Sequence, residues 1–123
     1  MSRSLQKQPS PESFLPVPPA TFHILLALSD GDLHGYAIMQ DVAQRSEGAV
    51  RLGPGTLYGA LKRLLEARLV EESERANAER GDERRRYYRL TPLGLAVARA
   101  EARRLDAILR AARRKKLIGE RPA

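Results

Sequence analysis

The stretch RLGPGTLYGALKRLLEARLV, residues 51–70, decides the fold of this chain. It opens with the tripeptide GPG at residues 53–55, where proline lacks an N–H and already has a φ suited to the first position of a helix. Leu57, Leu61, Leu64 and Leu65 follow at i, i+4, i+7 and i+8, which is the spacing of one apolar helix face. The pattern therefore predicts an amphipathic helix over residues 54–67.

The opposite face of this helix is polar, partly flat and basic. Two glycines leave part of it without side chains, and its other members are Thr56, Lys62, Arg63 and Glu66, with Tyr58 on the flank. A face of this kind can approach a phosphate backbone and reach the edges of bases. The alternative interpretation is an ordinary solvent-facing surface, which most amphipathic helices carry.

Composition narrows the class of protein. The 123 residues, 42% hydrophobic and 30% charged, suit one globular domain of modest core. No apolar run is long enough to cross a membrane, and the N-terminus lacks an apolar signal core, so the sequence predicts a cytoplasmic protein with no membrane partner. The chain has no cysteine and only two isolated histidines, which argues against disulfides and predicts neither a metal site nor a cofactor.

The positive charge is unevenly distributed. The net charge is +7, and residues 51–70 contribute four basic groups against one acidic group. Residues 71–89 are balanced, with six groups of each sign, whereas residues 90–123 hold nine basic and three acidic groups. A basic total indicates a polyanionic partner, most simply double-stranded DNA. The alternative is a general solubility charge on an arginine-rich protein.

The part of the chain before this stretch predicts a lead-in and two helices. Four prolines within residues 1–18 predict a disordered or extended segment. Residues 20–29 are apolar nearly all round, which is typical of a buried helix, with His23 as a partly buried, hydrogen-bonded residue in it. We expect His34 at the entry to a second helix. In that helix the residues spaced for one face are Tyr36, Met39, Val42 and Ala43.

After residue 67 the spacing of apolar residues changes from that of a helix to that of β-strands. Residues 69–75 suit a solvent-edge strand, residues 76–84 are polar with a turn signal, and residues 85–90 alternate and are rich in tyrosine. Two strands joined by a charged loop make a hairpin, which must pack on the helices to be stable. Three helices followed by a hairpin is the layout of a winged helix-turn-helix, in which the third helix enters the major groove and the hairpin is the wing.

A long C-terminal helix completes the chain. Thr91 is an N-cap before Pro92, and the helix is expected over residues 92–116. Small and apolar residues repeat along it at intervals of four and three, which favours a dimer seam over a helix packed only on its own domain. The predicted dimer interface is Ala98, Ala102, Leu105, Ile108, Leu109 and Ala112. The fold class is therefore mainly α with a small β-hairpin, a winged helix-turn-helix plus a long C-terminal dimerisation helix.

Five motifs in this order resemble the PadR-type transcriptional regulators. They are ILLAL (24–28), LHGYAIM (33–39), GPGTLYGALKRL (53–64), LVEES (69–73) and RRYYRLTPLG (85–94), and together they cover roughly residues 20–95. The resemblance is to the short branch of the family, because a single C-terminal helix follows the wing. It implies a dimer through that helix, a pseudo-palindromic operator and usually repression. It also implies, for some members, release from DNA when a small, often aromatic, molecule binds.

The predicted assignments follow from the residues and the resemblance together. The domains are a lead-in (1–18), a winged helix DNA-binding domain (19–91), a dimerisation helix (92–117) and a tail (118–123). The predicted DNA-contacting residues are Arg51, Thr56, Tyr58, Lys62, Arg63, Arg84, Arg85 and Arg86. A winged helix module that binds acidic proteins is the alternative. No nucleophile–base pair, phosphate loop or metal set supports an enzyme.

Overall fold

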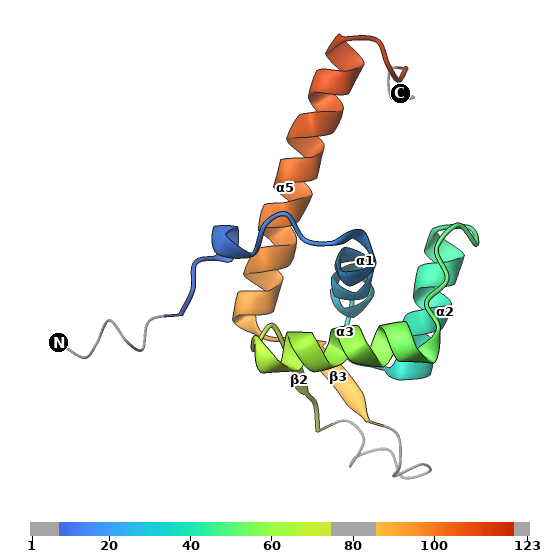
Figure 1. The fold of residues 1–123 in the computed structure, drawn as a ribbon, viewed down its shortest axis with the longest axis vertical. Helices are drawn as coiled ribbons and strands as arrows, with labels where there is room; N and C mark the ends of the chain where they lie inside the picture. Colours follow the sequence, from blue (N-terminus) through green and yellow to red (C-terminus); the bar gives the residue numbers. More distant parts are fainter. Residues whose placement is uncertain (1–7, 75–85, 120–123) are drawn as a thin grey trace, which may run out of the picture.

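The structure is a computed structural model that describes residues 8–74 and 86–119. It confirms the predicted fold class: a mainly helical chain with a small antiparallel sheet (Figure 1). The elements are, in order, η2 (Pro11–Phe14), α1 (Pro19–Leu28), β1 (Leu33–His34), α2 (Gly35–Arg45), α3 (Pro54–Glu66), β2 (Val70–Glu72), β3 (Tyr87–Leu90) and α5 (Pro92–Arg114). Among the described residues, no helix has the length and apolar character needed to span a membrane.

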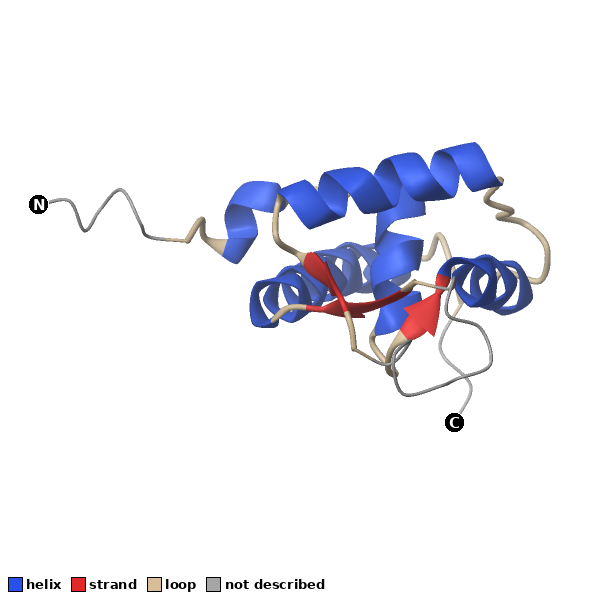
Figure 2. Cartoon of the chain, turned by 90° about the horizontal axis from the view of Figure 1, so that it is seen from below, coloured by secondary structure: helices blue, strands red, loops and turns tan. Residues whose placement is uncertain are grey.

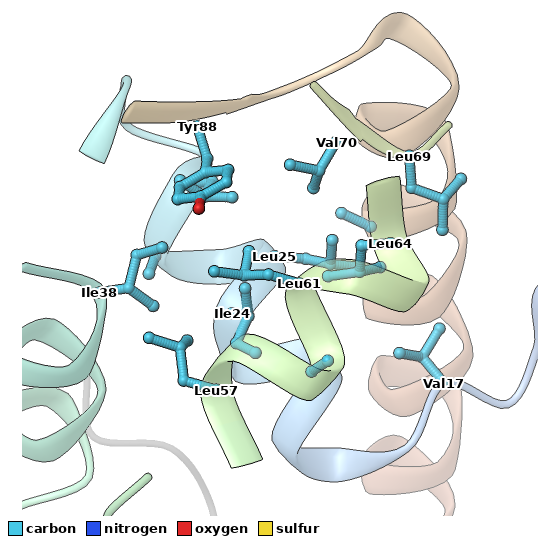
Figure 3. Packing of buried hydrophobic residues seen from close by; sticks show 14 of the residues in the cluster. Val17, Ile24, Leu25, Ile38, Leu57, Leu61, Leu64, Leu69, Val70 and Tyr88 are labelled. Atoms are coloured by element: carbon cyan, nitrogen blue, oxygen red, sulfur yellow. The ribbon is translucent and has the colours of Figure 1, made fainter. Parts of the chain in front are cut away.

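The core forms where α1 and α3 bring their apolar residues together (Figure 3). Ile24 and Leu25 of α1 are fully buried, as expected for a helix that is apolar nearly all round. From α3 the core takes Leu57, Leu61 and Leu64, which are each at most 4% exposed. The predicted leucine face of α3 is therefore its buried face. Each such side chain contributes about 1.5–3 kcal/mol on burial.

The second helix packs on much of the predicted face, but Tyr36 is not part of it. Its fully buried side chains are Ile38 and Val42, whereas Tyr36 is 60% exposed. Val42 is buried as predicted and Met39 packs partly buried against the core, whereas Ile38, four residues before Val42, takes the place expected for Tyr36. Tyr36 is consequently a surface residue on the first turn of α2.

The sheet has three strands rather than the two of the predicted hairpin. Its strand order is β1-β3-β2, so the returning strand β3 is central. The added strand β1 pairs with β3 through Leu33 opposite Tyr88 and His34 opposite Tyr87. Two residues are too few to show an alternating pattern, so the sequence carried no signal for β1. The turn predicted within residues 76–84 lies outside the described residues.

A short hydrogen-bonded junction joins the end of α3 to the start of α5. The backbone N–H of Thr91 donates to the carbonyl of Leu69 (3.0 Å), and the Thr91 hydroxyl donates to the carbonyl of Arg68 (2.7 Å). The same hydroxyl accepts from the N–H of Gly94 (2.9 Å), which confirms Thr91 as the N-cap of α5. Gly94 packs so closely that an added Cβ would overlap the Leu69 carbonyl.

The N-terminal segment, residues 8–18, differs from the disordered or extended lead-in that its prolines predict. Pro11–Phe14 forms a single 3-10 turn that packs against α5. Val17 is 8% exposed and belongs to the core, and its N–H donates to Oε1 of Glu101 on α5 (3.3 Å). The packing partners lie more than eighty residues away in sequence, so composition alone could not indicate them.

Candidate nucleic-acid interface

The outer face of α3 is open to solvent. Figure 2, seen from below, shows α3 as the uppermost helix, at the outer edge of the molecule. Thr56, Tyr58, Lys62 and Arg63 are all exposed on it, opposite the buried leucines. An added Cβ at Gly55 would meet no atom within 4 Å, so this end of the face is flat and unobstructed. The structure thus presents four predicted contact residues on one accessible helix surface.

Tyr58 also connects the two helices of the helix-turn-helix. Its hydroxyl lies over Gly35 at the start of α2, in the space that a Cβ at Gly35 would occupy. The motifs LHGY (33–36) and GTLY (55–58) are therefore in direct contact. Tyr88, beneath them on β3, has a pKa raised above its ordinary value of 10.0, first by burial and then by the neighbouring Tyr58. Tyr58 remains 47% exposed, so the rest of its ring is available at the surface.

The wing carries cations that are already paired. Arg86 lies 3.5 Å from Glu72, and Arg89 donates from Nε to Glu71 at 2.8 Å. This hydrogen bond to the Glu71 carboxylate is the main cause of the raised pKa of Arg89. Arg84 and Arg85, both predicted contact residues, lie outside the described residues. The described part of the wing is thus close to neutral.

The cations on α3 and in the loop before it differ from those of the wing, because no carboxylate in the described part of the chain forms an ion pair with them. Arg51, in the loop before α3, is exposed, and its guanidinium lies near Gly48. In the described part of the chain, none of the ion pairs includes Arg51, Lys62 or Arg63. These three charges can meet an external anion without first leaving an internal carboxylate, which favours α3 over the wing strands as the main electrostatic contact.

The predicted dimer residues fall into two groups along α5. Ala98 is 8% exposed and lies in the core of its own chain. Leu105 and Ala112 are half-buried, while Ala102 is exposed. Ile108 and Leu109 are 52% and 46% exposed, as large apolar side chains on a helix that extends past the domain. The surface available to a partner thus begins after Ala98.

One of the two histidines caps a helix, and the other is partly buried. Nδ1 of His34 accepts the N–H of Ala37 at 3.2 Å, so His34 caps α2 and its predicted role at the helix entry is confirmed. His23 is partly buried as predicted, but its Nδ1 has no hydrogen-bond partner among the described residues. The described part of the chain contains no group of three or more His, Cys, Asp or Glu residues arranged to hold a metal ion.

Sequence reasoning missed two residues that the structure makes prominent. Tyr36, predicted on the packed face of the second helix, is instead exposed immediately beside the Gly35–Tyr58 contact. Glu101 is 1% exposed and binds Arg104 through both carboxylate oxygens, at 2.8 and 2.6 Å. Glu101 follows the buried Leu93 and Val97 at intervals of four, so it lies on the face of α5 that packs on its own domain and not in the predicted seam.

The chain resembles known proteins both in sequence and in structure. Residues 24–100 match the model of the transcriptional regulator PadR-like family. A transcriptional regulator of Mycobacterium tuberculosis, Rv3488, is 34% identical over 88 residues, which cover 72% of this chain and 77% of that protein. An uncharacterized 37.1 kDa protein in transposon TN4556 of Streptomyces fradiae is 48% identical over 79 residues, and the match spans 64% of this chain but only 21% of that protein.

Solved structures agree with these matches. A PadR family transcription regulator from Clostridium difficile R20291 has a TM-score of 0.62 and 25% identity, covering 79% of this chain and 97% of that chain. A transcriptional regulator from Clostridium thermocellum has the same score and identity, covering 76% and 86%.

Proposed function

Because the chain belongs to the PadR-like family and is a DNA-binding transcription regulator rather than an enzyme, we propose that it is a repressor. In this proposal it acts in the cytoplasm as a homodimer on a pseudo-palindromic operator, and a small molecule releases it. Repression is steric, because a dimer seated on operator DNA excludes RNA polymerase from the same site.

The observation that carries the proposal is the exposed face of α3. It combines a flat end at Gly55 with Lys62 and Arg63, two cations outside the described ion pairs. In a winged helix the third helix enters the major groove. There Thr56 and Tyr58 reach base edges, and Lys62 or Arg63 binds guanine acceptors or phosphate.

The remaining contacts are expected around this helix. Arg51 lies just before α3 and is placed to bind a flanking phosphate. Arg86, with the wing residues Arg84 and Arg85, is expected to contact the backbone on the other side. The exposed apolar side chains of α5 pair two copies, which gives the two recognition helices needed for a two-fold symmetric site.

The test is operator affinity after the two α3 cations are removed. We would measure binding of Lys62→Ala/Arg63→Ala to duplexes from the DNA upstream of the reading frame, with Arg114→Ala/Lys115→Ala on α5 as a control of equal charge loss. Loss of a base-contacting pair costs about 1–3 kcal/mol of discrimination, so the α3 variant should bind roughly ten- to a hundredfold more weakly. Equal weakening by both variants would mean that general charge, not α3, determines binding.

The salt dependence of the same binding locates the phosphate contacts. The logarithm of affinity should fall with the logarithm of salt concentration by about 0.9 per phosphate neutralised. Removing Lys62 or Arg63 should reduce this slope more than removing Arg86, because Arg86 is already paired with Glu72. A larger reduction from Arg86 would place the main contact on the wing, and a flat response would indicate a partner other than DNA.

A further inference from the structure

A cavity of about 190 Å³ lies between the N-terminal segment and α3. It is lined by the end of the N-terminal segment, including Phe14 and Val17, by residues of α1 and α3, and by Ala67 and Leu69 after α3. Leu25, Leu64 and Leu69 supply apolar lining. Figure 3 shows Val17 entering the core from the N-terminal segment, on the side of the cluster where Leu64 and Leu69 lie.

Among the described residues that line the cavity, two have polar side chains, Thr21 on α1 and Arg63 on α3, and none is acidic. The guanidinium of Arg63 lies close to Gly59 on the exposed side of α3. Within the described residues, Arg63 belongs to none of the ion pairs. An apolar chamber with a cation outside those ion pairs at its edge is complementary to an apolar molecule that ends in an anionic group.

We propose that this cavity is a binding site for a small alkyl carboxylate. The carboxylate accepts hydrogen bonds from Arg63 and Thr21, and the alkyl chain lies against Leu25, Leu64 and Leu69. The size is suitable, because an apolar cavity of about 150 Å³ accepts benzene, so a chain of about six carbons fits in 190 Å³. The bond from the carboxylate to arginine is charge-assisted, which makes the anionic end the principal source of selectivity.

The site bears on regulation because Arg63 belongs to two surfaces. It lines this cavity, and it is one of the exposed cations on the DNA-facing side of α3. A bound carboxylate neutralises Arg63 and holds its side chain toward the N-terminal segment, so the same guanidinium no longer binds phosphate or a base. This consequence rests on the proposed function, whereas the binding site itself does not.

The test of the site is a calorimetric titration of the whole chain without DNA. The probe is hexanoate, and hexan-1-ol and hexylammonium are the matched neutral and cationic molecules. Hexanoate should bind saturably at one molecule per chain, hexan-1-ol roughly tenfold more weakly and hexylammonium more weakly still. Absence of saturable hexanoate binding, or equal binding of all three molecules, would overturn the proposal.

Two variants place the binding in this cavity. Ala60→Leu fills space at the buried wall of α3, and Arg63→Gln removes the charge at an exposed position where folding is not at risk. Each should weaken hexanoate binding at least about tenfold, whereas Ala107→Leu on the exposed face of α5 should not change it. Unchanged binding by Arg63→Gln would refute the proposed contact whatever the stability of Ala60→Leu.

A second measurement separates this site from the proposed function. Hexanoate at saturation should weaken the binding of upstream DNA to the wild-type chain and have no effect on the already weaker binding by Arg63→Gln. If hexanoate binds but no upstream DNA does, the cavity assignment stands and the repressor proposal fails. If DNA binds and hexanoate does not, the reverse holds.

Discussion

The two halves of α5 differ sharply although they form one continuous helix. In the first half, Leu93, Val97 and Ala98 belong to the core, and Glu101 at its end is also buried. Beyond Glu101 no residue of the helix is buried, and Ile108 is 52% exposed. Figure 1 shows this second half projecting beyond the rest of the described structure.

This difference in burial shows which part of α5 contributes to the core of the domain. Residues 102–114 extend the helix by about 20 Å at 1.5 Å per residue, and the described part of the chain buries none of them fully. A helix of this length is marginal in water unless its apolar face is covered. The first half is therefore part of the winged helix domain, and the second half is the surface proposed for a second copy.

The largest effect on folding is expected at Gly94, in the first half. Gly94→Val places a Cβ on the carbonyl of Leu69, so backbone must move, and we expect a loss of about 3 kcal/mol or more in the free energy of unfolding. Urea denaturation measures this. Gly55→Ala is the control, because its Cβ meets no atom within 4 Å and should leave stability unchanged or raised by at most about 1 kcal/mol. An unchanged free energy of unfolding in Gly94→Val would contradict the close packing of α5 on Leu69.

A smaller effect is expected at Glu101, where the two halves meet. Glu101→Gln keeps an acceptor for the N–H of Val17 but loses the ionic bond to Arg104, so we expect a loss of about 1–2 kcal/mol. The control is Asp106→Asn in the second half, which breaks an exposed pair with Arg110 at 3.5 Å and should cost at most about 0.5 kcal/mol. Equal costs would mean that burial makes no difference to these pairs.

The Glu101 contribution should depend on pH in a defined direction. The hydrogen bonds from Arg104 are the main reason that the pKa of Glu101 lies below its ordinary value of 4.5, although burial opposes them. A lowered folded pKa gives stability that is present above the unfolded pKa and lost as the pH falls through the folded value. Wild type and Glu101→Gln should therefore differ by a constant amount near pH 7 and converge below pH 4.5.

The smallest effect on the domain itself is expected in the second half. Ile108→Asp should change the unfolding free energy of the isolated chain by at most about 0.5 kcal/mol, because the side chain is half exposed. In a dimer the same change buries an unpaired carboxylate, so the dimer should open. Sedimentation equilibrium measures the mass, and a dimer that persists in Ile108→Asp would place the interface elsewhere.

The parts of the fold that follow a local rule were predictable from the sequence. The leucine face of α3, the N-caps at His34 and Thr91 and the order of helices before the wing all depend on residues within one or two turns of each other. The predicted DNA face also formed, in that Thr56, Tyr58, Lys62 and Arg63 share an exposed surface. Their contacts with DNA stay a prediction.

The missed parts depend on contacts between distant segments. Strand β1 exists because Leu33 and His34 meet β3, more than fifty residues later. The N-terminal segment is ordered by Val17 packing into the core and by Glu101 on α5. Ala98 has the spacing of a dimer seam, yet the helix was already burying that residue in its own domain. Periodicity identifies an apolar face without indicating what covers it.

The junction between α3 and α5 couples the orientations of the two helices. Thr91 makes three hydrogen bonds there, and Gly94 packs directly on the carbonyl of Leu69. These contacts fix the first turn of α5 against the residues that follow α3. In a dimer held through the distal part of α5, a change in the crossing angle of the two long arms therefore swings both α3 helices. The crossing angle of the two α5 helices would then set the distance between the two half-sites that the proposed dimer can bind. Substitutions in α5, far from the DNA, would change the preferred spacing of the operator.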